Sequence, residues 1–332
     1  MPLRLDADKS EPIGTEARPA ASPVRPPAAV ESARPPKSVP GPEPVWPSVR
    51  ALAAGSVAQW RTTAKSLAAG VMVGSGAQSG AAATPQVVVL PPFTLVSSWE
   101  AYLAEGARLA KEAGVWLIPG AALEPSTDFT GSYRSASCFG PDGREVIRQR
   151  ELFLPDGGLL LRGETIATFT CAGWPAALVV GEDIYFPEVS RLAALRGARL
   201  LIVSGLVPQD RPQLRQLAGA WQEVQQNQVY ALEASALVPV GRRAQELNQE
   251  LNQELNMETT TAVWAPCEIT PDGRGWLDWP ARQDERPATA LLESEPLLWI
   301  RHEYPLEHFS NPDLYELRLR EAYRALQATE AQ

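Results

Sequence analysis

Cysteine and histidine are scarce in this chain, which has three cysteines and two histidines among 332 residues. Cys138, Cys171 and Cys267 are too few for a disulfide framework and too widely spaced for a local metal motif. We therefore expect buried free thiols and a reducing, cytoplasmic compartment. His302 and His308 lie six positions apart with a proline between them, a spacing that matches no metal-ligand motif. The sequence thus predicts no metal and no other cofactor.

Positive charge and long apolar runs are also in short supply. The chain carries 30 Lys and Arg against 39 Asp and Glu, a formal net charge of −9, and its pI is about 5.0. That is the wrong sign for a general surface that holds nucleic acid or anionic membrane. The segment Met1–Gly14 has no apolar run that could serve as a secretory signal, and polar residues and glycines interrupt the Ala-rich segment 66–83. We expect small molecules or other proteins as partners, with no nucleic acid and no membrane.

Composition divides the chain into a tail over 1–48 and a domain over 49–332. Prolines recur every few residues from Glu11 to Pro47 with almost no large apolar side chains, so this tail is predicted to be disordered and partly polyproline II. It is either a passive linker or a docking site. A tandem tetrapeptide at 246–256, within an insertion at 243–257, is either an amphipathic helix or a repeat expansion in a surface loop.

Strand-like and helix-like segments alternate through the domain, and hairpins are interspersed among them. This pattern predicts a mixed α/β sandwich rather than a purely parallel sheet. The expected strands cover 49–57, 86–90, 115–118, 135–139, 145–150, 165–170, 176–180, 199–204 and 229–234, and the expected helices cover 59–73, 98–113, 189–196 and 213–226.

One segment carries a recognisable motif. The run Leu178-Val-Val-Gly-Glu-Asp-Ile-Tyr-Phe-Pro-Glu188 resembles the nucleophile segment of the nitrilase (carbon-nitrogen hydrolase) superfamily, in which an apolar strand is followed by Cys-Glu-Asp or Cys-Tyr-Asp and then Phe-Pro-Glu. Other segments also resemble segments of this family and follow one another in the same order, so the resemblance covers roughly residues 49 to 310. It implies an α-β-β-α sandwich whose subunits commonly pair, helix layer to helix layer, so that a homodimer or a heterodimer with a related chain is expected.

The family's three catalytic positions carry other residues in this alignment. Gly181 stands in place of the cysteine nucleophile, and Pro92 in place of the general-base glutamate. Arg150 takes the place of the lysine, and its side chain is expected to fill the vacated space. Such chemistry needs a thiolate, a carboxylate and a cation, so the first two functions are absent and the third is altered.

The rest of the motif is assigned a structural role. Glu182 and Asp183 are expected to shape the turn and its hydrogen bonds, together with Phe186 and Pro187, and Glu188 suits the start of a helix. The leading interpretation is a pseudoenzyme that binds a small ligand or assembles with a partner. One alternative is an active carbon-nitrogen hydrolase with displaced catalytic residues. Another is a scaffold that works through its tail and repeat.

Overall fold

The computed structural model describes residues 44–56, 58, 84–95, 98–128, 130–154, 160–239, 258–280, 286–306 and 311–330. Residues 1–43 of the predicted tail, the whole of the predicted helix over 59–73, and the repeat insertion at 243–257 lie outside the described residues. None of the helices in these ranges is long and apolar enough to cross a membrane.

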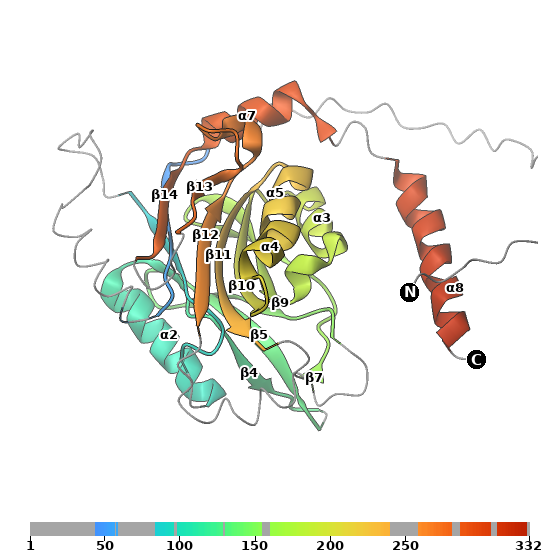
Figure 1. The fold of residues 1–332 in the computed structure, drawn as a ribbon. Coiled ribbons are helices and arrows are strands. Elements are labelled where there is room, and N and C mark those ends of the chain that lie inside the picture. The colour runs from blue at the N-terminus through green and yellow to red at the C-terminus, as the bar shows by residue number, and fades with distance from the viewer. Residues whose placement is uncertain are drawn as a thin grey trace, which may run out of the picture. The chain divides into compact units, whose positions relative to one another are not determined.

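Two mixed β-sheets form the centre of the domain (Figure 1). In sheet A the strands run in the order β14-β1-β2-β3-β5-β4, and β6 and β7 also pair with β5. These strands are β1 (Val49–Ala53), β2 (Gln86–Val89), β3 (Trp116–Ile118), β4 (Ala121–Pro125), β5 (Ser132–Phe139), β6 (Glu145–Arg150), β7 (Leu160–Leu161) and β14 (Ala288–Leu292).

Sheet B is built in the order β13-β12-β11-β10-β9-β8. Its central strands β9, β10 and β11 are parallel, and antiparallel strands extend the sheet on both sides. The strands are β8 (Thr168–Cys171), β9 (Trp174–Gly181), β10 (Leu200–Pro208), β11 (Tyr230–Val238), β12 (Thr259–Trp264) and β13 (Trp276–Asp278).

Helices cover the outer face of each sheet. One apolar cluster joins α2 to sheet A through Leu109 and Ala110, and another joins α3 and α5 to sheet B through Val189 and Val224. The α-β-β-α sandwich expected from the sequence is therefore confirmed. The helices are α2 (Trp99–Ala113), α3 (Pro187–Leu195), α4 (Pro212–Gln216), α5 (Gln222–Asn227), α7 (Ser294–Glu303) and α8 (Arg320–Glu330), with short helical turns η1 (Asp183–Tyr185), η2 (Leu217–Trp221), η3 (Cys267–Ile269) and η5 (Leu314–Leu319).

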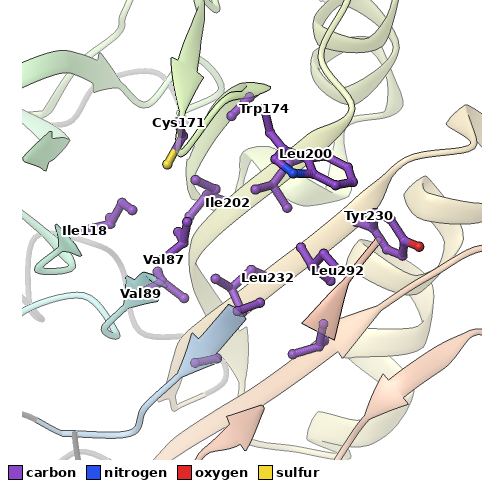
Figure 2. Close-up of a cluster of buried hydrophobic side chains, with 14 of the residues drawn as sticks. Val87, Val89, Ile118, Cys171, Trp174, Leu200, Ile202, Tyr230, Leu232 and Leu292 are labelled. Carbon is purple, nitrogen blue, oxygen red and sulfur yellow. The ribbon is translucent and has the colours of Figure 1, made fainter. Parts of the chain in front are cut away.

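The largest apolar cluster lies between the two sheets. Figure 2 shows Val87 and Val89 of sheet A facing Ile202 and Leu232 of sheet B. Trp174, the first residue of β9, belongs to the same cluster. All five side chains are fully buried. Both faces of the inner strands are covered, which explains why segments such as 87–90 are continuously apolar.

Two helical segments show how far local sequence determines these elements. Helix α2 agrees with the helix expected over 98–113. It begins after Ser98, whose hydroxyl accepts a hydrogen bond from the Ala101 amide, and it ends at Gly114 in the left-handed conformation. The single helix expected over 213–226 is instead interrupted by the π-helical turn η2, where Gly219 has φ −107° and ψ −106°. A Cβ at Gly219 would lie 3.0 Å from the Tyr185 ring, so tertiary packing accompanies this break.

Strand β9 leads directly to the candidate site. It forms a hairpin with β8 through the turn at Ala172 and Gly173, and it runs parallel to β10 until Gly181 lies beside Gly205. Gly181 is thus at the carboxyl end of a central parallel strand, where ligand sites of open α/β sheets are usually found.

Candidate functional site

The Gly181 turn has no room for a side chain on its first residue. Gly181 has φ +63°, and a Cβ built there would lie 2.0 Å from Oε1 of Glu151 and 2.9 Å from Nη1 of Arg134. Any larger residue would therefore adopt a strained backbone and also displace a buried charged group. The space beside the Cα atom of Gly181 is therefore filled by side chains of this chain.

An ion pair occupies this space. Nη1 of Arg134 on β5 lies 2.5 Å from Oε2 of Glu151, and these side chains are 1% and 0% exposed. The other carboxylate oxygen of Glu151 accepts a hydrogen bond of 2.7 Å from the Glu182 amide. Burial raises the pKa of Glu151 to about 7 and outweighs the attraction of Arg134. The pair joins sheet A to the end of β9 in sheet B.

Arg150 lies elsewhere, contrary to the expectation that it would fill the space beside Gly181. Its Nε and Nη2 atoms donate to Glu124 at 3.0 and 2.8 Å, and its guanidinium stacks 3.7 Å from the centre of the Tyr133 ring. Although burial raises the pKa of Glu124, hydrogen bonds from Arg150, Ser135 and Arg148 lower it to about 2. Neighbouring residues of an extended chain point to opposite faces, so Glu151 faces Gly181 when Arg150 faces away.

Pro92 follows β2 at the same edge of the sandwich, where its ring is buried. The next residue, Phe93, has φ +63° and packs against Leu206 of β10 and Ala236 of β11. The Phe93 amide donates to the Ala121 carbonyl, and the Ala121 amide donates to the hydroxyl of Ser204 on β10. The end of β2 thus carries no carboxylate, and a phenyl ring covers the ends of β10 and β11.

The backbone at this edge is tightly fixed. A Cβ at Gly120, which has φ +93°, would lie 1.9 Å from the Pro91 carbonyl oxygen. The hydroxyl of Thr94 donates to the same oxygen at 2.7 Å. Only glycine allows this close approach, so the Pro91-Pro92 segment is held against the start of β4.

The remaining motif residues form the turn into α3. The carboxylate of Asp183 accepts hydrogen bonds of 2.9 Å from the amides of Leu152 and Phe153, and burial raises the pKa of Asp183 to about 7. Phe186 stacks on Phe153 with ring centroids 4.2 Å apart. Pro187 opens α3, and Glu188 lies in its first turn and accepts a hydrogen bond from the Tyr323 hydroxyl.

A hollow of about 400 Å³ opens beside this turn. Its floor and walls are mainly apolar, but it also presents one carboxylate and one guanidinium. The lining residues are Leu152, Phe153, Leu154, Arg162, Glu182 and Phe186.

The three thiols lie away from the Gly181 turn. Cys138 and Cys171 are fully buried in the cluster between the sheets, and burial raises the pKa of Cys171. Cys267 is half-buried near Gly275. His302 is exposed beside Glu303, while His308 falls outside the described residues. Within the described ranges no three His, Cys, Asp or Glu side chains gather as a metal site.

Sequence reasoning missed the two residues that fill the site. Arg134 interrupts a strand whose following five residues are all buried, and Glu151 directly follows β6. A charged residue in a buried strand needs a partner of opposite charge, and this was the available signal. The two residues are 17 positions apart in the chain, and nothing in the local sequence indicated that they pair.

Replacing Gly181 by alanine should destabilise the protein much more than the same change at Gly114. Both glycines have left-handed φ values, +63° and +65°, but a Cβ at Gly114 meets nothing within 4 Å. Gly114→Ala isolates the backbone cost of about 1 kcal/mol. Gly181→Ala should cost about 3–5 kcal/mol because it also disrupts a buried ion pair. Denaturant unfolding measures both, and equal losses would contradict the packing described for Gly181.

The free energy of unfolding should fall as the pH rises from about 5 to 8. Burial raises the folded-state pKa values of Glu151 and Asp183 to about 7, from ordinary values of 4.5 and 3.8. The stability that they contribute is complete below the unfolded pKa values and is lost as the pH rises through the folded ones. Glu151→Gln should flatten this dependence in urea titrations, and an unchanged slope would show that Glu151 does not titrate in this range.

Several solved structures have the same architecture as this chain. A carbon-nitrogen hydrolase from Helicobacter pylori G27 superposes with a TM-score of 0.58 at 19% identity, covering 81% of this chain and 96% of that one. Nit3 of Saccharomyces cerevisiae, a member of branch 10 of the nitrilase superfamily, gives 0.57 at 18% identity, covering 78% and 95%. At these identities the similarity supports the fold.

Comparison of sequences shows the family to which the chain belongs. The omega-amidase NIT2 of Mus musculus is 29% identical over 30% of this chain and 39% of its own length, and the Homo sapiens protein is 28% identical over the same shares. The chain thus matches about two fifths of the length of these relatives. The family model for carbon-nitrogen hydrolases matches residues 51–253, more than half of the 332 residues. The chain therefore belongs to the carbon-nitrogen hydrolase family.

Proposed function

We propose that this protein is a pseudoenzyme, which uses the carbon-nitrogen hydrolase fold for ligand binding or assembly rather than for hydrolysis. The observation that carries the proposal is the filled space at Gly181, where Glu151 and Arg134 occupy the volume that a side chain would need. An attacking thiol needs an approach to its substrate, and the buried ion pair closes that approach. The packed ring of Phe93 supports the same conclusion at the end of β2.

The substitutions also remove the chemical groups. Position 181 provides no nucleophile, and position 92 provides no carboxylate to move a proton. In another hydrolase that uses a nucleophilic side chain, removing that side chain lowers turnover by a factor on the order of 10⁶. The cation in this space, Arg134, is paired with Glu151 and is 1% exposed, so it is not available to stabilise charge on a bound substrate.

The purified protein is expected to release no ammonia from a panel of simple amides, nitriles and N-carbamoyl compounds. Gly181→Cys should remain inactive, because its Cβ would collide with the Glu151 carboxylate. Circular dichroism verifies that both samples are folded. Turnover that persists through a second purification would overturn the proposal in favour of an active hydrolase with a displaced nucleophile.

We also propose that the helix layer on sheet B pairs with a second copy or with a related chain. Three large apolar side chains are exposed there, with Leu192 and Leu195 of α3 at 39% and 57% and Leu214 of α4 at 57%. Apolar side chains gathered on one exposed face are typical of an association surface. The tail and the repeat, on which a scaffold role would depend, lie outside the described residues.

Leu195→Glu should shift the protein towards monomer in sedimentation equilibrium, since a charge would be placed in the association surface. Leu291→Glu is the matched control, because Leu291 is 49% exposed on β14, which belongs to the other sheet. A monomeric unaltered protein, or equal effects of the two variants, would contradict pairing through α3.

A further inference from the structure

Two of the three cysteines lie together between the sheets. Cys138 belongs to β5 of sheet A, and Cys171 is the last residue of β8 in sheet B, where it lies opposite Trp174 at the start of β9. Both thiol side chains are fully buried in the apolar cluster between the sheets. Figure 2 shows Cys171 in this cluster together with Ile118 of sheet A. The two cysteines thus reach the same interior from opposite sheets.

The alternation of side chains along β5 explains why Cys138 points towards sheet B. Residues two positions apart share one face of a strand, so Arg134, Ala136 and Cys138 project in the same direction. Arg134 reaches the Gly181 turn of sheet B, and Ala136 belongs to the cluster between the sheets. One face of β5 therefore contacts sheet B at both ends of β9, with Arg134 at the carboxyl end and Cys138 near the start.

The thiols of Cys138 and Cys171 are in contact with each other. Burial and the hydrogen bond with Cys138 raise the pKa of Cys171 well above its ordinary value. Both thiols are free in this structure. Sulfur atoms at hydrogen-bonding distance need to approach by only about 2 Å to form a disulfide bond. The two strands therefore already hold the sulfur atoms close to bonding distance.

We propose that Cys138 and Cys171 form a disulfide with a small disulfide such as oxidised glutathione as the oxidant, and that this bond locks the two sheets together. The thiolate of one cysteine attacks the oxidant, which gives a mixed disulfide and releases one reduced glutathione. The thiolate of the other cysteine displaces the second glutathione and closes the protein disulfide. The protein thereby loses two electrons and two protons, which the two departing glutathione molecules carry as thiols.

Burial determines when this exchange takes place. The thiolate is the reacting form of cysteine, so a buried thiol with a raised pKa is a poor nucleophile. Glutathione cannot approach side chains that are fully buried, and the exchange therefore requires local separation of the sheets. The pair reacts slowly while the protein is folded. Once the disulfide has closed, the same burial protects it from reductants.

Oxidation of the full chain with oxidised glutathione, at urea concentrations below the unfolding transition, tests the site. The product is denatured, its remaining thiols are alkylated, and its peptides are mapped by mass spectrometry without reduction. We expect linked peptides that contain Cys138 and Cys171. Cys267, whose neighbours are Gly275 and the carboxylates of Glu268 and Asp272, should remain a thiol or carry a glutathione adduct. More urea should accelerate the linkage because it favours local opening.

The oxidised chain should unfold at a urea concentration about 1 M higher than the same sample after reduction with dithiothreitol, because the link restricts the unfolded chain. Cys267→Ala is the matched control and should retain this difference. Cys138→Ala and Cys171→Ala should each abolish it, and circular dichroism verifies that both variants are folded.

The inference is overturned if Cys138 and Cys171 become reactive towards a thiol reagent in urea but are not linked by the oxidant. Pairing of Cys267 as readily as the other two cysteines would also contradict it, as would a linked chain that is no more stable than the reduced one. These measurements use the unaltered chain, so they decide the matter even if a variant fails to fold.

Discussion

The buried ion pair between Arg134 and Glu151 is the constraint on which the rest of the candidate site depends. Transferring two charges out of water costs several kcal/mol for each ion, and a site retains them only when they are paired and hydrogen-bonded. Here the carboxylate binds the guanidinium with one oxygen and the Glu182 amide with the other. Removing either partner would leave the other as an uncompensated charge. The pair, the turn and the glycine at 181 therefore require one another.

The same contacts hold the backbone of the turn in place, although its first residue, Gly181, has no side chain. Asp183 fixes the two amides that follow Glu151, and Glu151 fixes the amide that precedes Asp183. These reciprocal hydrogen bonds join sheet A to the carboxyl end of β9. In a hydrolase of this family the same edge would need an open space for substrate. Here the space is filled with charged groups at β9 and with the Phe93 ring at β10 and β11.

A filled space at Gly181 and an open hollow both lie beside one short turn. The hollow owes its shape to the contacts that close the space at Gly181, since Glu151 and Asp183 position the backbone of both walls. The exposed leucines of α3 begin on the helix that follows the same turn. The turn thus leads directly into the helix that carries the candidate association surface.

The sequence by itself determined the mixed α/β class and the main features of the motif. The strand expected over 86–90 and the helix expected over 98–113 correspond to β2 and α2, and the segment 178–188 located the turn at the end of β9. It also places a proline at position 92 and a glycine at position 181, where the resemblance implies a glutamate and a cysteine. These features depend on local composition and spacing, which a single sequence displays directly.

Only the tertiary structure decided which charged groups lie at the turn. The sequence predicted that Arg150 would lie beside Gly181. Instead, β6 pairs with β5 so that Arg150 lies opposite Ser135, and the guanidinium of Arg150 points towards Glu124. A shift of one residue along the strand reverses the face to which each side chain points, so Glu151 enters the site instead. Likewise, the helix is broken at Gly219, where the backbone lies against the Tyr185 ring. No proline stands at this break. Strand register and contacts between distant segments decide such details, because neither is encoded in the local pattern of residues.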